Sequence, residues 1–141
     1  TGPIHLHDYV GATADVATRW NAPPQLVRAD GEKLGMHGFG IVSGVSIYGT
    51  SWWRLGPCAL DDQRWELFLL PALTIANAAR LATAAAVTGL DHARGVARHE
   101  VRGVRIEGEA PSPVQIDGDF AGTTPLELTL GERQARLIRP A

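Results

Sequence analysis

Apolar and polar residues alternate along the second half of the chain. From Val96 onward the alternation recurs in five short runs, which glycine, proline or acidic residues separate: VARHEV, GVRIEGE, PVQID, PLELTL and ARLIRP. A period of two places every second side chain on one face of a β-strand, and regularly spaced short strands are typical of a sandwich or a barrel. The pattern therefore predicts antiparallel strands from Val96 to the end of the chain.

Further strands are expected before these runs. PQLVRAD predicts a short strand that ends in a turn at Asp30-Gly31, and a longer strand from about Gly38 to Tyr48 completes a hairpin. The segment 64–71, RWELFLLP, first alternates apolar side chains on one face and then becomes apolar on both. This is expected of a strand that enters a core, and its proline ends it.

Two segments have the composition of helices. Residues 73–89, LTIANAARLATAAAVTG, are rich in alanine, with Thr74 placed to cap the start and Gly89 placed for a left-handed end. The small side chains of this segment favour close packing on a sheet. Residues 7–21 also predict a helix, with Asp8 near its start and the prolines of NAPP preventing its continuation.

Composition and charge narrow the class of protein. The chain has 141 residues, of which 45% are hydrophobic and 20% charged, and its sixteen glycines and nine prolines indicate many turns. This length favours a single domain. A formal charge of -2 gives no general case for nucleic-acid binding, which needs a basic surface to displace phosphate counterions. The single cysteine, Cys58, cannot form an internal disulfide, so we expect a reducing, cytoplasmic location.

The sequence has neither a membrane-spanning stretch nor a signal pattern. No run approaches eighteen uninterrupted apolar residues, and the amino terminus lacks a charged segment followed by an apolar one. The chain begins with Thr1 rather than methionine, so we expect it to be part of a longer polypeptide.

Acidic residues at two predicted turns are candidates for chemistry. VQIDGDFAGTTP (114–125) places Asp117 before a glycine, and Asp-Gly between alternating runs is foremost a hairpin signal. Taken alone, the turn is the favoured reading of Asp117. Asp61 and Asp62 precede the strand at 64–71, and adjacent carboxylates at a bend could bind Mg²⁺ with backbone carbonyls, although a plain turn is the more frequent explanation.

Other polar patterns in the sequence give weaker evidence for a functional site. GFGIVSG (38–44) lacks the glycine spacing and the following helix of a dinucleotide site, and no GxxxxGK[ST] phosphate loop is present, so the sequence shows no self-sufficient ATP site. His5 and His7 could share one strand face, but two ligands do not make a metal site.

A basic region and a pair of tryptophans each allow more than one interpretation of their role. The basic region could contact phosphates or membrane headgroups, whereas the favoured alternative is a solvated sheet face paired with Glu100, Glu107 and Glu109. Its members are Arg94, Arg98, Arg102 and Arg105, interleaved with His92 and His99. SWWR (51–54) supplies either core anchors or side chains suited to a bilayer edge or an acyl chain.

Residues 24–140 resemble the carboxy-terminal domain of the bacterial diacylglycerol kinase and sphingosine kinase-like lipid kinases. The order and spacing of several motifs carry this resemblance: PPQLVRADGE, SGVSIYG, GPCALDDQRWELFLL, TGLDH, VRGVRIEGEAPSPVQIDGD and ARLIRP. The resemblance implies a mainly β fold, a two-layer antiparallel β-sandwich with one or two helices. It divides the chain into a leading helical segment, 1–22, and a substrate-side domain, 23–141.

The resemblance also implies roles for particular residues. Asp117 corresponds to the proposed proton acceptor for the lipid hydroxyl, and Asp119 stands where the family usually has glutamate. The turn ALDDQ resembles a magnesium-binding turn with Asp62 as its best ligand, although the turn is one residue shorter and Gln63 replaces the typical glycine. ATP is implied to bind to a separate amino-terminal domain that this chain does not contain, so these residues alone are expected to be inactive.

The implied substrate is diacylglycerol or a similar lipid alcohol, and the implied location is cytoplasmic, peripheral at the inner membrane face. An alternative is a stand-alone, non-catalytic lipid-binding β-sandwich module. A third is a structural sandwich that associates through its tryptophans. A glycine-rich nucleotide domain encoded directly before Thr1 would favour the kinase, and a start codon there would favour the module.

Overall fold

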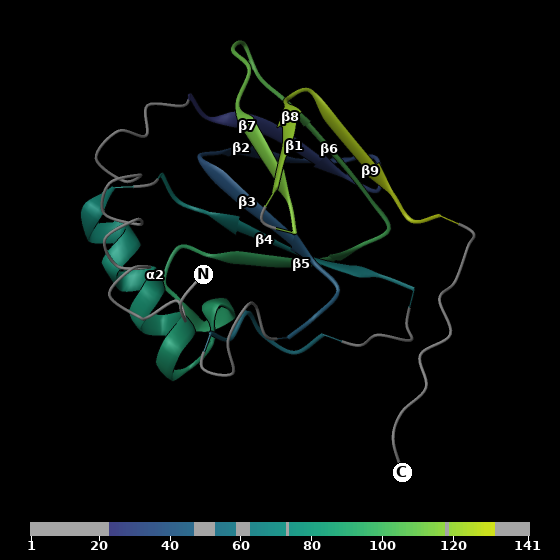
Figure 1. Cartoon of the computed structure of the whole chain (residues 1–141). Helices are drawn as coiled ribbons and strands as arrows, with labels where there is room; N and C mark the ends of the chain where they lie inside the picture. The colour runs from purple at the N-terminus through teal and green to yellow at the C-terminus, as the bar shows by residue number, and fades with distance from the viewer. Residues whose placement is uncertain (1–22, 47–52, 59–62, 73, 118, 132–141) are drawn as a thin grey trace.

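Strands dominate the computed structural model, which describes residues 23–46, 53–58, 63–72, 74–117 and 119–131 (Figure 1). The strands are β1 (Gln25–Ala29), β2 (Glu32–His37), β3 (Phe39–Ser43), β4 (Trp65–Leu70), β5 (Ala97–Val101), β6 (Gly103–Glu107), β7 (Pro113–Ile116), β8 (Asp119–Thr123) and β9 (Leu126–Thr129). Helix α2 (Ile75–Val87) and a short 3₁₀ turn, η1 (Leu90–His92), lie between β4 and β5. The predicted mainly β, sandwich-like fold is confirmed.

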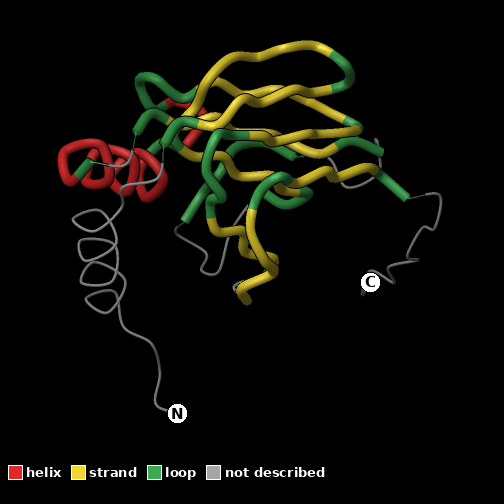
Figure 2. Tube along the Cα trace, turned by 90° about the horizontal axis from the view of Figure 1, so that it is seen from above, coloured by secondary structure: helices red, strands yellow, loops and turns green. Residues whose placement is uncertain are grey.

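The strands form three antiparallel sheets. One sheet has the order β2-β1-β6-β9, the second has the order β3-β4-β5, and β7 and β8 form a separate two-stranded sheet. Strands far apart in the sequence are neighbours, since β1 pairs with β6 and β6 pairs with β9. Figure 2 shows the β7–β8 hairpin projecting from the body formed by the larger sheets.

The two larger sheets pack face to face around one apolar core, called here the sheet–sheet core. It contains Leu67 and Leu69 of β4, and these meet side chains from both sheets: Val27, Ala29, Val101 and Val104. Successive side chains of a strand point to opposite faces, so the alternate positions of β4 must be covered by something else.

Helix α2 covers the other face of β4. Phe68 and Leu70 pack in a second cluster, the helix-side core, together with Leu55, Leu81, Ala85, Leu90 and Ala93. Leu81 and Ala85 belong to α2, whose small side chains let the helix approach the sheet closely. β4 is therefore buried on both faces, as the apolar run in 64–71 predicted, and the molecule is a sandwich with a helix layer added on one side.

The caps of α2 agree with the sequence in part. The Thr74 hydroxyl accepts a hydrogen bond of 3.2 Å from the Asn77 N–H, which confirms the predicted N-cap. Gly89 follows the helix with φ 111° and ψ 149°, a glycine conformation but not the predicted left-handed helical one. No helix in the described ranges is both long and apolar enough to cross a membrane.

The predicted partner of the first strand was wrong. The turn at Asp30-Gly31 is present, but the strand that pairs with β1 is β2, which begins directly after it with Ala29 opposite Glu32. At Gly38 the chain leaves this sheet, and β3 joins the second sheet by pairing with β4. A Cβ atom at Gly38 would lie 2.7 Å from the Cα of Ala72, so glycine is needed where the chain crosses between sheets.

Four of the five predicted late runs are strands, namely β5, β6, β7 and β9. β8 was not among the predicted runs because DFAGT contains a single large apolar residue and alternates poorly. The run ARLIRP and the predicted helix at 7–21 lie outside the described residues. β3 occupies most of the segment 38–44.

We expect Gly38→Ala to lower the free energy of unfolding by about 1–3 kcal/mol, because the added methyl group overlaps backbone that cannot rotate away. Gly40→Ala is the matched control, since a Cβ there would meet its neighbours at 3.8 Å, an ordinary contact. Urea denaturation of both variants is the measurement. Equal stabilities for the two variants would show that Gly38 is not confined by Ala72.

Candidate functional site

The β7–β8 hairpin holds Asp117 at its turn. Ile116 pairs with Asp119, so Asp117 and the glycine after it connect the strands, as the sequence predicted. Asp117 has a φ of 53°, in the left-handed region that aspartate tolerates better than most residues. The turn places the Asp117 side chain at the extremity of the hairpin.

A second Asp-Gly turn, at Asp30, differs from that of Asp117 in the hydrogen bonds of its carboxylate. Asp30 has a similar φ of 48°, but its carboxylate accepts hydrogen bonds from the backbone N–H groups of Arg102 at 3.0 Å and Gly103 at 2.8 Å. Asp30 thereby fixes the bend between β5 and β6. Asp117 is exposed, and its side chain makes no hydrogen bond or ion pair with the described part of the chain. Among the described residues, the Asp117 carboxylate is therefore exposed and has no polar partner.

Buried polar side chains anchor the root of the hairpin. The Thr124 hydroxyl donates a hydrogen bond of 3.0 Å to Gln25 Oε1 and accepts one of 2.9 Å from the Ser112 N–H. The Thr124 N–H in turn donates to the Ser112 carbonyl at 2.8 Å. Gln25 Nε2 donates to the carbonyls of Pro23 and Ala110, at 3.1 Å and 3.3 Å. These contacts tie both strands of the hairpin to β1.

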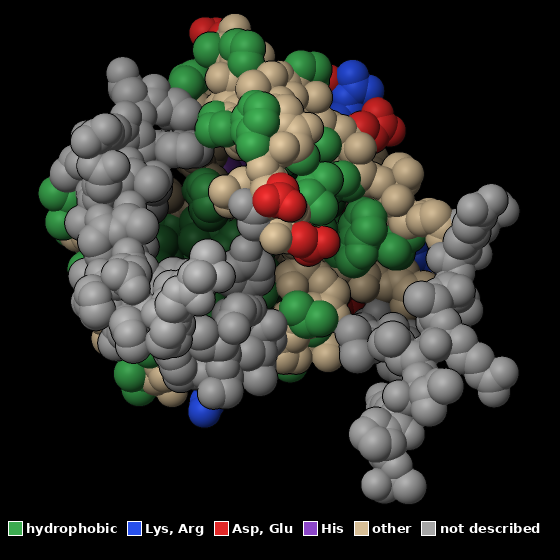
Figure 3. All heavy atoms as spheres, viewed as in Figure 1, with side chains coloured by type: hydrophobic (Ala, Val, Ile, Leu, Met, Phe, Trp, Pro, Cys, Tyr) green, Lys and Arg blue, Asp and Glu red, His purple; other side chains and the backbone are tan. Residues whose placement is uncertain are grey.

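The hairpin tip, defined as Ile116, Asp117, Asp119 and Phe120, combines acidic and apolar side chains. Ile116 is 54% exposed and Phe120 is 71% exposed. Asp119 is also exposed and, like Asp117, contacts no polar partner within the described ranges. Figure 3 shows acidic side chains beside hydrophobic ones in the middle of the front face. Such a surface fits a ligand that is polar at one end and apolar at the other.

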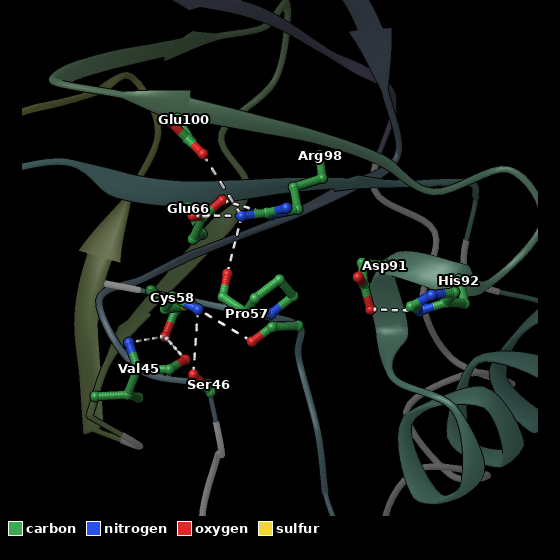
Figure 4. A network of polar contacts seen from close by, with 11 residues as sticks. Val45, Ser46, Pro57, Cys58, Glu66, Asp91, His92, Arg98 and Glu100 are labelled. Carbon is green, nitrogen blue, oxygen red and sulfur yellow. Dashed lines mark hydrogen bonds and ion pairs between the residues drawn. The ribbon is translucent and has the colours of Figure 1, made fainter. Parts of the chain in front are cut away.

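Asp117 does not line either of two hollows found among the described residues. One has a volume of about 320 Å³ and contains Asp91 and His92, whose Oδ1 and Nδ1 atoms are 3.0 Å apart (Figure 4). The other, of about 230 Å³, lies beside Asp30. A cleft around Asp117 would need atoms beyond the described part of this domain.

The arginines of β5 and β6 are engaged in ion pairs. Arg98 binds Glu66 through two bonds of 2.7 Å, from Nε to Oε2 and from Nη2 to Oε1, and Nη2 also donates to the Pro57 carbonyl at 2.9 Å (Figure 4). Hydrogen bonding to Glu66 is the largest cause that raises the pKa of Arg98. Arg105 pairs with Glu107 at 2.6 Å and with Glu127 at 3.8 Å.

For Arg98 and Arg105, the pairs with Glu100 and Glu107 agree with the predicted pairing on a sheet face, but the main partner of Arg98, Glu66, was not among the predicted ones. The Glu66 side chain is only 5% exposed, so Arg98 serves to neutralise a nearly buried carboxylate. Trp53 is partly buried and packs against the helix-side core, which makes it a core anchor. Trp52, His5 and His7 lie outside the described residues.

The predicted magnesium ligand, Asp62, also lies outside the described residues, as does Asp61. Gln63, which directly follows, has a φ of 56°, a conformation that favours glycine. Within the described ranges no group of three or more His, Cys, Asp or Glu side chains could hold a metal ion.

Sequence reasoning missed the contacts that hold the site. Gln25 and Thr124 are 99 residues apart, and neither stands in a recognisable motif. The Arg98–Glu66 pair likewise joins residues on adjacent strands that are 32 positions apart. Only the pairing of strands reveals these contacts, because nothing in the local sequence distinguishes them from surface polar residues.

The structure resembles solved structures of kinases at low sequence identity. A "putative diacylglycerol kinase" from Bacillus anthracis strain Sterne superposes with a TM-score of 0.63 and 15% identity over 86% of this chain and 40% of its own. A second structure, also described as a putative diacylglycerol kinase from this organism, superposes with a TM-score of 0.61 and 16% identity. The match covers 86% of this chain and 41% of that one. A structure described as a diacylglycerol kinase from the same organism superposes with a TM-score of 0.59 and 14% identity. The match covers 83% of this chain and 42% of that one.

The likeness establishes the fold. This chain spans about 40% of the length of the structures it matches. No protein-family model matches the chain, and no curated protein matches it.

We expect Thr124→Val to destabilise the protein by about 1–3 kcal/mol, because the substitution keeps the shape but leaves the buried Gln25 and Ser112 groups without their partner. Thr123→Val, at the adjacent exposed position, is the matched control and should change stability by less than about 0.5 kcal/mol. Thermal unfolding measures both. Were the two variants equally stable, the buried hydrogen bonds would not hold the hairpin.

Proposed function

We propose that this chain is the carboxy-terminal, substrate-side domain of an ATP-dependent lipid kinase that phosphorylates the hydroxyl of diacylglycerol or a similar lipid alcohol. The exposed carboxylate of Asp117, held at the tip of an anchored hairpin, is the observation that carries the proposal. The fold likeness to the Bacillus anthracis structures and the motif order from PPQLVRADGE to ARLIRP support it.

Asp117 acts as the proton acceptor in this reaction. The alcohol oxygen forms a bond to the terminal phosphorus of ATP, the bond from that phosphorus to the bridging oxygen breaks, and ADP leaves. The hydroxyl proton passes to the Asp117 carboxylate. Phosphoryl transfer depends mostly on positioning and charge stabilisation, so one well-placed carboxylate is a sufficient contribution from this domain.

The anchored root of the hairpin suits this role. A base must stay within hydrogen-bond reach of the hydroxyl, and small displacements cost much of the rate. The buried contacts of Gln25 and Thr124 restrain the hairpin against the sandwich while leaving its tip accessible. ATP binds to a separate amino-terminal domain of the complete protein, and a cytoplasmic location, peripheral at the inner membrane face, would bring the tip to its lipid.

A magnesium ion held by Asp62 and neighbouring carbonyls belongs to the same proposal. Oxygen ligands from a carboxylate and backbone carbonyls suit this ion. Its role would be to stabilise the turn before β4 rather than to take part in phosphoryl transfer. The left-handed backbone at Gln63 supports a turn of this kind.

We expect Asp117→Asn in the full-length protein to reduce kcat by about 10²–10⁴-fold, because asparagine keeps the turn but cannot accept the proton. Asp30→Asn is the matched control: it alters the other Asp-Gly turn, so it should lower stability and leave kcat close to that of the wild type. Steady-state assays with lipid alcohols and ATP measure the effect. Near-normal turnover by the Asp117 variant would remove this residue from the mechanism.

We expect Mg²⁺ to raise the melting temperature of the wild-type protein by several degrees, since a ligand that binds only the folded state stabilises it. Asp62→Asn should abolish most of this increase, while Asp30→Asn should retain it. Differential scanning calorimetry with Mg²⁺ and with EDTA gives the measurement. An undiminished increase in the Asp62 variant would exclude Asp62 as a ligand.

A further inference from the structure

Three cationic side chains form a row across the four-stranded sheet. Arg28 of β1 is directly opposite Lys33 of β2 on one side and Arg105 of β6 on the other. Opposite residues of an antiparallel pair share a face, with Cβ atoms about 4.5–5.5 Å apart. The residues that adjoin the row along its three strands pack in or against the sheet–sheet core: Val27, Ala29, Leu34, Val104 and Ile106. The row therefore lies on the outer face of β2, β1 and β6, which are neighbours in Figure 1.

This row is unfavourable unless its charges are compensated, because like charges directly opposite each other destabilise a sheet. Arg105 is compensated by Glu107 at 2.6 Å and by Glu127 at 3.8 Å. Arg28 and Lys33 make no side-chain hydrogen bond or ion pair within the ranges that the structure describes. Lys33 is exposed and Arg28 is partly exposed. Two neighbouring cations are thus accessible to an anion from outside the chain.

A hollow of about 230 Å³ lies beside this row. Its lining includes Arg28, Arg105 and the turn at Asp30-Gly31. The Asp30 carboxylate accepts two hydrogen bonds from backbone N–H groups, at 2.8 Å and 3.0 Å, so its charge is already stabilised by donors of the chain. The hollow therefore offers room for a small anion next to Arg28.

We propose that Arg28 and Lys33 bind a phosphate group, an inference that goes beyond the proposed function and does not involve Asp117. A guanidinium donates two parallel hydrogen bonds to a phosphate, and an ammonium supplies a compact positive charge. A phosphate between the two side chains replaces their repulsion with two attractions. Arg105, which has carboxylate partners of its own, borders this site.

The charges of the face favour a single phosphate group over the surface of a membrane. Attraction to an anionic bilayer uses clusters of about 4–8 basic residues. The row has three cations, and it ends at Glu127, which is opposite Arg105. The ligand is therefore one phosphate group, which either a soluble phosphate compound or an individual lipid headgroup can supply.

The test measures binding of radiolabelled inorganic phosphate to the complete protein by equilibrium dialysis at constant ionic strength. Arg28→Gln and Lys33→Gln should each weaken this site about tenfold, because each removes a charge-assisted hydrogen bond. The double variant should bind one equivalent of phosphate less than the wild type, and Lys33→Arg should retain binding. Arg94→Gln, which removes an exposed charge outside the row, is the matched control and should change binding less than twofold.

Phosphate bound elsewhere in the complete protein is common to all variants, so the difference from the wild type reports this site. Equal phosphate binding by the wild type and the double variant would overturn the inference. Melting temperatures without phosphate provide a second check. Lys33→Gln should melt no lower than the wild type, because it removes a repelled charge, and a lower value would contradict the repulsion from which the inference starts.

Sedimentation with phosphatidylcholine vesicles, with and without phosphatidic acid, identifies the source of the phosphate. If the double variant loses the part of binding that requires phosphatidic acid, the ligand is a lipid headgroup; if it keeps that part but loses inorganic phosphate, the ligand is soluble. Asp117→Asn should bind inorganic phosphate like the wild type whatever its turnover. A failure of the proposed function would therefore not be mistaken for a failure of this site.

Discussion

Burial of both faces of β4 is the constraint on which the rest of the structure depends. Leu67 and Leu69 hold the two sheets together, while Phe68 and Leu70 hold the helix layer to the same strand. Full burial of one such side chain contributes about 1.5–3 kcal/mol, so this strand supplies a large share of the apolar stabilisation. A polar residue at any of these positions would separate two layers from each other.

β4 also contains one buried charge. Glu66 precedes the apolar run and is neutralised by two hydrogen bonds from Arg98 on the neighbouring strand. A buried pair of this kind adds little net stability, because desolvation offsets most of its attraction, but breaking it leaves a charge in the interior. Arg98 makes a third bond, to the Pro57 carbonyl, which attaches the segment 53–58 to the sheet.

The candidate site lies apart from this core. The hairpin projects from the sandwich, and its connection is a set of buried hydrogen bonds among Gln25, Ser112 and Thr124. A rigid scaffold that presents reactive groups on an exposed turn is a common arrangement in enzymes. Here it leaves the Asp117 carboxylate exposed at the tip of the hairpin.

The sequence by itself determined the elements whose signals are local. Four features were predictable: the buried strand in 64–71, the Thr74 cap, and the turns at Asp30 and Asp117. The spacing of apolar residues, helix capping and left-handed turns each depend on a few adjacent residues. Only the tertiary structure decided that the chain changes sheets at Gly38 and that Gln25 binds Thr124. It also decided that the Asp30 carboxylate is hydrogen-bonded, whereas that of Asp117 has no polar partner in the described part of the chain. These features depend on which distant strands pair, and two identical Asp-Gly dipeptides carry no local information about what their carboxylates will meet.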